Sequence, residues 1–270
     1  MGVIDVLDGS FAALRQRARV LITIVAGFVL PISLFQGWVT RDDLGGATFT
    51  EILNDPTVAQ EVSQTSSVYD AGYLVGQVLG MFVTAVAGVG VAWVVNAWFE
   101  GRDPTARDAL RFIVGRAGPI VGAFVVIHLL QLLGFVLLVV PGLALVVLSS
   151  LTSPVLAVES LGPVASMRRS WELVQRRIGS VVAVLLLSVV VQFGVSQAVG
   201  TLPVIAALLL GPDRAWPLVA VSTMVTQLIL VPANGAAMAL LYLDIRFRTE
   251  GLDLHRRFFL ELPPADGPVR

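Results

Sequence analysis

Six long runs of apolar residues dominate the sequence, and charged residues are almost confined to the stretches between them. An α-helix needs about 20 apolar residues to cross the hydrocarbon core of a bilayer, and shorter runs of about 17 still suffice. The runs predict transmembrane helices at 20–39, 71–98, 119–140, 142–158, 178–200 and 216–243. The predicted fold class is therefore an all-α membrane protein with six transmembrane helices, which form a membrane domain over residues 20–245.

Proline and glycine interrupt several of these runs. Pro141 and Gly142 separate the third run from the fourth and predict a tight turn, because proline ends a helix and glycine tolerates unusual dihedral angles. Pro154 in the fourth run and Pro232 in the sixth each remove a backbone hydrogen bond, which predicts a kink or a break. The short run 204–210 either extends the fifth helix beyond its proline or lies at the interface.

The charges predict an orientation. The chain has 18 arginines and no lysine. All of them except Arg41 and Arg214 lie before the first run, in the second and fourth connections between runs, or after the sixth run. Cytoplasmic loops of membrane proteins carry an excess of Lys and Arg, so this pattern predicts that both termini are cytoplasmic. The absence of lysine beside abundant Val, Ala, Leu and Arg is typical of a GC-rich bacterial genome. We therefore expect a multi-pass protein of the bacterial plasma membrane.

Arginines alternate with apolar residues at helical spacing just before the first, third and fifth runs, at 11–19, 109–116 and 167–177. Such stretches predict amphipathic interfacial helices before helices 1, 3 and 5, with the first occupying residues 1–19. One interpretation is a threefold repeat of interfacial helix plus helical hairpin; the other is that any basic stretch beside a membrane has this pattern. Residues 246–270 are predicted to form a cytoplasmic tail.

Composition excludes several classes of protein and site. The chain is 56% hydrophobic and 14% charged, with a mean hydropathy of +0.84, whereas soluble domains carry roughly 25% charged residues. The absence of cysteine excludes disulfides and thiolate chemistry, and two histidines do not suffice for a histidine-rich metal site. We find no Ser-His-Asp set, no paired carboxylates at membrane depth and no phosphate-binding glycine loop. The sequence thus predicts no enzymatic activity and no cofactor.

Among the uncharged polar side chains inside the predicted helices, five are candidates for lining a cavity: His128, Gln131, Gln192, Gln227 and Asn234. Polar groups at membrane depth are costly and often functional. They predict either hydrogen bonds between helices or a polar cavity between broken helices 4 and 6, as in a small-solute or lipid transporter. Whether they converge on one cavity decides between these alternatives.

Two charged groups of residues border the membrane domain. Glu159 lies within reach of Arg168 and Arg169 across a short loop, which favours a structural ion pair that holds this loop. The functional alternative is a site for an anionic lipid headgroup at Arg168, Arg169, Arg176 and Arg177. A candidate ion-pair lock on the cytoplasmic face consists of Glu159, Asp244, Arg246 and Glu250. The leading hypothesis is a non-enzymatic membrane module that acts as a scaffold or binds lipids or a partner through this arginine-rich face. Its expected partners are membrane lipids and another membrane protein, and not nucleic acid, because arginines beside a membrane serve orientation first.

Several segments resemble a known family. The motifs are 99–110, Ser153-Pro154 with Glu159, Gly162-Pro163, 169–173, and 242–254 with its Tyr-x-Asp-x-Arg pattern followed by Glu-Gly-x-Asp-Leu. They resemble bacterial, largely actinobacterial, integral membrane proteins and are similar to the membrane domain attached to some glycerophosphoryl diester phosphodiesterases. No metal-binding set of Glu, Asp and His follows the last run, so the hydrolytic activity is not expected here. The resemblance implies a six-helix membrane module.

Overall fold

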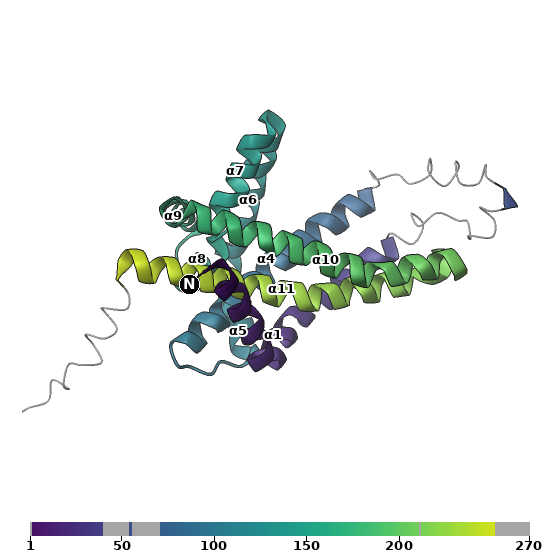
Figure 1. The fold of residues 1–270 in the computed structure, drawn as a ribbon, viewed down its shortest axis with the longest axis horizontal. Helices are drawn as coiled ribbons and strands as arrows, with labels where there is room; N and C mark the ends of the chain where they lie inside the picture. Colours follow the sequence, from purple (N-terminus) through teal and green to yellow (C-terminus); the bar gives the residue numbers. More distant parts are fainter. Residues whose placement is uncertain (1, 40–53, 56–70, 211, 252–270) are drawn as a thin grey trace, which may run out of the picture.

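The computed structural model describes residues 2–39, 54–55, 71–210 and 212–251, and within these ranges all regular structure is helical (Figure 1). The helices are α1 (Val3–Val39), α4 (Ala71–Phe99), α5 (Ala106–Gly115), α6 (Ala117–Leu137), α7 (Val139–Ser149), α8 (Thr152–Val158), α9 (Pro163–Arg176), α10 (Ile178–Leu210) and α11 (Pro212–Glu250). Six helical segments of this described part are long and apolar enough to cross a membrane, with α7 and α8 together forming the fourth. This confirms the expected all-helical class and indicates a multi-pass membrane protein. Apart from residues 54 and 55, the connection 41–67 lies outside the described residues, as does the tail beyond residue 251.

Helix α11 is the centre of the bundle. It packs along α1, α4 and α10, and the α6–α7 hairpin diverges from this group (Figure 1). Its residues belong to two apolar clusters: Val231 and Ala236 pack with α1, α4, α5 and α6, while Leu241 and Ile245 pack with α8, α9 and α10. A helix buried on nearly all sides holds its neighbours in fixed positions, so the side chains of α11 define what those neighbours enclose.

A short amphipathic helix precedes the first, third and fifth long segments, and each junction is an arginine. α1 bends at Arg17, which has φ −123° and ψ 26°. Arg116, with φ −111° and ψ 13°, separates α5 from α6, and Arg177, with φ −145° and ψ 44°, separates α9 from α10. These three junctions occur at the places where the sequence suggested a repeat. The location of the short helices at a lipid interface stays a prediction.

The prediction of a turn at Pro141 and Gly142 is wrong. The extended residue between α6 and α7 is Leu138, with φ −165° and ψ 152°, and Pro141 lies in the first turn of α7. Proline is well tolerated in a first helical turn, because the amide hydrogen that it lacks has no partner there. Gly142 then packs α7 against α6, since a Cβ atom at Gly142 would lie 2.4 Å from the Phe135 ring.

The expected break in the sixth helix is also absent. α11 continues through Pro217 and Pro232 to Glu250. Proline costs one backbone hydrogen bond, but its φ is helical, so a helix packed on several sides remains intact. The fourth segment does break, at Ser150 and Leu151 between α7 and α8. The fifth helix extends beyond Pro203 as α10, which settles the two alternatives for residues 204–210.

Candidate functional site

A cavity of about 360 Å³ lies among α4, α6, α7, α8, α10 and α11. Four of the five polar residues expected at membrane depth line it: His128, Gln131, Gln192 and Asn234. Hydroxyl side chains complete its polar wall, namely Ser149, Ser150, Thr152, Ser153 and Ser188. Gln227 does not reach this cavity and instead lines a neighbouring one together with His128.

Helical spacing explains why these residues share a wall. On α10, Ser188 and Gln192 are four residues apart, and on α11 the same spacing relates Asn234 to Met238, so each pair lies on one face of its helix. The hydroxyls of the fourth segment flank the break at 150–151. The sequence alone did not single out Ser188, because one serine in an apolar helix is usually a packing residue.

Some polar groups in the cavity wall have partners within the protein. Gln131 donates from Nε2 to Ser149 Oγ at 3.0 Å, and Ser149 donates to the Leu145 carbonyl at 2.6 Å. Nδ1 of His128 lies 2.8 Å from the Phe124 carbonyl. A carbonyl oxygen can only accept, so Nδ1 must carry a proton, and in the neutral ring Nε2 is then an acceptor.

Three hydroxyls in the same wall have unused hydrogen-bonding capacity. The oxygens of Ser150, Thr152 and Ser188 are buried, and no described group is their hydrogen-bond partner. Leaving a buried polar group unpaired costs about 1–3 kcal/mol. A ligand that carries hydroxyl or amide groups would satisfy these oxygens. Among the described residues that line the cavity there is no aspartate, glutamate or arginine, so the cavity suits an uncharged group.

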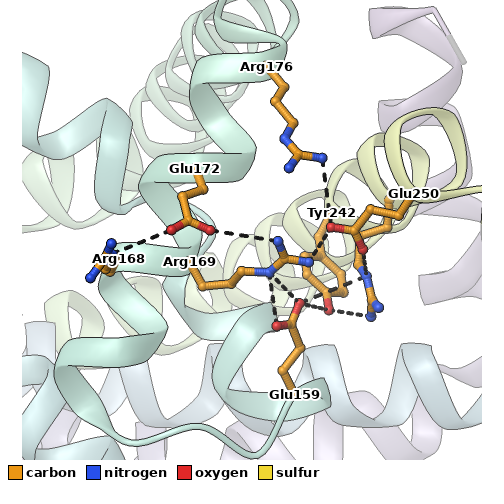
Figure 2. A network of polar contacts seen from close by, with 8 residues as sticks. Glu159, Arg168, Arg169, Glu172, Arg176, Tyr242 and Glu250 are labelled. Atoms are coloured by element: carbon orange, nitrogen blue, oxygen red, sulfur yellow. Dashed lines mark hydrogen bonds and ion pairs between the residues drawn. The ribbon is translucent and has the colours of Figure 1, made fainter.

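An ion-pair network joins the ends of α8, α9 and α11 (Figure 2). Glu159 accepts from Nε of Arg169 at 3.0 Å and from the Tyr242 hydroxyl at 2.9 Å. Arg246 donates from Nη1 to the Tyr242 oxygen and from Nε to Glu250, both at 2.8 Å. Arg169 also donates to Glu250. The phenol thus lies between a carboxylate and a guanidinium, donating to the first and accepting from the second.

The residues expected to contact anionic lipid separate into different environments. Arg169 belongs to the network and is 19% exposed, whereas Arg168 is 82% exposed and pairs with Glu172 at 3.5 Å. Arg176 lies 3.9 Å from Glu250, and Arg177 donates to Ser180. Burial lowers the pKa of Arg169, but hydrogen bonds to Glu250 and Glu159 outweigh it, so its pKa is raised. Arg169 is therefore a fixed cation of the network.

The expected ion-pair lock is only partly assembled. Glu159, Arg246 and Glu250 come together, but Asp244 pairs with Arg248 at 3.0 Å and does not reach the network. Successive helical residues are 100° apart, so residue 244 lies on a different face of α11 from residues 242, 246 and 250. Tyr242 was missed as a network residue, although its spacing of four from Arg246 was a usable signal.

The cavity and the network share two helices. On α11, Asn234 and Met238 line the cavity, and Tyr242 follows on the same face, about 12 Å from Asn234 at 1.5 Å per residue. On α8, Thr152 lines the cavity and Glu159 caps the opposite end. The network therefore lies beyond the cavity along α8 and α11, and we call this end of the bundle the network end.

No protein-family model, curated protein or solved structure matches this chain. The resemblance to the membrane domain of glycerophosphoryl diester phosphodiesterases therefore stays a prediction, and the site has to be interpreted from its own geometry.

Proposed function

We propose that this chain is a membrane protein that binds the uncharged, hydrogen-bonding part of a membrane lipid in the cavity beside His128. The observation that carries the proposal is the convergence of four polar residues from three helices on one cavity with three unpaired hydroxyls. A scaffold that acts only through its arginine-rich face needs no such cavity. The geometry therefore favours the transporter-type alternative.

The size and position of the cavity support a lipid as the ligand. Its volume of about 360 Å³ lies at the lower end of the roughly 300–1,000 Å³ of small-molecule sites. It holds a headgroup, not a whole lipid. Val189 and Gln192, which line the cavity on α10, are exposed, so the cavity opens on the outer surface of the bundle. In a membrane that surface is in contact with lipid.

We further propose that both termini and the network end face the cytoplasm of a bacterium. The basic connections gather at this end: Arg17 pairs with Asp103, and Arg116 donates to the carbonyls of Ser160 and Leu161. An accumulation of arginine on one side is what the positive-inside rule expects of the cytoplasmic side. The amphipathic helices α5 and α9 then lie in the inner interface.

The test is to purify the protein in a mild detergent and to identify lipids that stay bound by native mass spectrometry. We expect stoichiometric lipid on the unaltered protein and its loss in Ser188→Phe, which fills the cavity. Leu186→Phe is the matched control, because Leu186 is on the same helix but 62% exposed and outside the cavity wall. Equal lipid retention by the two variants, with both folded, would contradict the proposal.

A further inference from the structure

Two more cavities continue the first one away from the network end. The second, of about 400 Å³, shares Ala85 and His128 with the first and is also lined by Thr84 and Gln227. The third, of about 200 Å³, shares two residues with the second and reaches the far end of the bundle. The second and third cavities share Gln36 and Gln77. At the far end of the bundle, the third cavity is lined by Val39 and Gly72.

The order of the lining residues along α11 shows that the three cavities form one line. Asn234 and Met238 line the first cavity, Gln227 the second, and Val219 and Thr223 the third. From Val219 to Met238 the helix rises about 28 Å at 1.5 Å per residue, close to the roughly 30 Å thickness of the hydrocarbon core. The line of cavities is therefore as long as a membrane is thick.

Helix α4 gives the same order. Val89 and Ala85 line the first cavity, Thr84 the second, and Gly76 and Gly72 the third. Both helices begin near the far end of the bundle and end near the network end, so they run in the same direction. The two helices thus line the three cavities in the same order.

This line of cavities is open at the side. Gln77, Met81 and Thr84 on α4 are exposed, as is Gln192 on α10. Gln36 of α1 reaches across to α4 and donates from Nε2 to the Gly76 carbonyl at 2.9 Å. We call the whole feature the polar groove, defined by Gln36, Gln77, Thr84, His128, Gln131, Gln192, Gln227 and Asn234.

An exposed amide on a transmembrane surface is costly unless a polar group meets it, because hydrocarbon offers no hydrogen bonds. A lipid headgroup that crosses a bare bilayer meets the same cost, since it loses its partners in water. A row of amides and hydroxyls along the side of the bundle supplies replacement partners at every height. The acyl chains can remain in the bilayer, because the groove is open laterally.

We propose that lipids exchange between the two leaflets along the polar groove, with the headgroup in the groove and the acyl chains in the bilayer. The groove's described lining carries no charged side chain, so the class of substrate is a lipid with an uncharged or internally neutral headgroup. This inference rests on the proposed function, because the cavity beside His128 is the inner part of the groove. It adds a route across the membrane to a binding site.

The experiment uses the full-length protein in vesicles of phosphatidylethanolamine and phosphatidylglycerol. They contain phosphatidylethanolamine labelled on an acyl chain with a fluorophore that dithionite bleaches from outside. Protein-free vesicles lose only their outer-leaflet fluorescence. We expect vesicles with the protein to lose nearly all of it, because inner-leaflet lipid moves out and is bleached.

The decisive variant is Gln77→Leu with Gln227→Leu, which removes two amides from the middle of the groove. Neither residue lines the first cavity. We expect exchange to slow about tenfold or more, because the lining of the groove loses two polar side chains at mid-membrane and an apolar wall solvates a headgroup poorly. Gln197→Leu is the control, since Gln197 is an exposed residue of α10 that lines none of the three cavities. Gln77→Trp, which obstructs the groove from an exposed position, tests the same point if the double variant does not fold.

The outcomes separate this proposal from the previous one. Slow exchange by the double variant together with retained lipid in native mass spectrometry supports both. Lipid retained by the unaltered protein without exchange above the protein-free rate overturns the route and leaves the binding site standing. Exchange by the double variant at the unaltered rate also overturns the route. An osmotic assay with glycerol completes the test, because rapid swelling without lipid exchange would assign the groove to free solutes and overturn the lipid proposal.

Discussion

At the scale of single residues, the network around Tyr242 shows how charges can be held beside a membrane. Glu159, Arg169, Arg246 and Glu250 are each 16–20% exposed, so they have given up much of their hydration. Removing one partner of such a pair is expensive because its counter-charge remains behind in a poorly hydrated site. Small chemical changes in the network should therefore change the free energy of unfolding of the protein measurably.

We expect Tyr242→Phe to lower the free energy of unfolding by about 1.5–3 kcal/mol, the usual range for hydrogen bonds to charged groups. The substitution removes only the hydroxyl that donates to Glu159 and accepts from Arg246. Thermal unfolding in detergent provides the measurement. Thr249→Val is the control, because the Thr249 hydroxyl bonds only to the Ile245 carbonyl on the same helix. Equal stability of the two variants would show that the phenol does not hold the network together.

Charge reversal at Glu250 should be more severe. Glu250→Lys places a fourth cation beside Arg169, Arg176 and Arg246, and we expect a loss of about 3–5 kcal/mol in the free energy of unfolding with reduced expression. Glu172→Lys is the matched control: Glu172 is 49% exposed, pairs with the exposed Arg168 at 3.5 Å and lies 3.9 Å from Arg169. Its pairs are largely exposed, and exposed pairs contribute about 0–1 kcal/mol. Normal folding and expression of Glu250→Lys would remove the structural role that we assign to the network.

At the scale of helices, close approach of backbones sets the geometry of the groove. A Cβ atom at Gly37 would lie 2.6 Å from the Ala220 Cβ, so α1 and α11 touch at this point only because residue 37 lacks a side chain. Gly80 has a related role on α4, since a Cβ atom there would lie 2.7 Å from Nε2 of Gln36. These glycines place Gln36 between α1 and α4.

We expect Gly37→Ala to destabilise the protein by about 1–3 kcal/mol, because it overpacks the contact between α1 and α11. Gly27→Ala on the same helix is the control. No atom lies within 4 Å of its added Cβ, so the substitution should be neutral or stabilising by up to about 1 kcal/mol through helix propensity. Thermal unfolding of the two variants gives the comparison, and a Gly37→Ala protein as stable as Gly27→Ala would contradict the tight packing.

Local sequence also predicted much about the helices themselves. Thr105 and Asp108 form a capping box at the start of α5, and a Thr followed three residues later by an acidic side chain is a local signal that favours a helix start. The turn expected at Pro141 and the break allowed at Pro232 are absent, because proline is compatible with a turn, a first helical turn or a packed helix interior. The neighbours of each proline select among these states, and those neighbours are remote in sequence.

At the scale of the whole molecule, the proposed orientation can be tested with single cysteines, because the sequence contains none. We expect Arg107→Cys, at an exposed position near the start of α5, to react with a membrane-impermeant maleimide only after the membrane is opened. Asn54→Cys, in the acidic connection between α1 and α4, should react in intact cells. The opposite labelling pattern would invert the orientation, and labelling of both from outside would contradict the assignment of the network end to the cytoplasm.

The sequence by itself determined six segments that are long and apolar enough to cross a membrane, the strong arginine bias and the polar residues inside the apolar runs, because run length and residue type are local properties. Tertiary structure decided which of these residues meet. His128 and Asn234 share a cavity, Gln227 lies further along the groove, and Asp244 points away from the network. Polar side chains inside apolar helices form a site only when the rotation of each helix about its axis and the packing of the helices bring those side chains together. That arrangement depends on helices that are remote in sequence, so no single segment of the sequence specifies it.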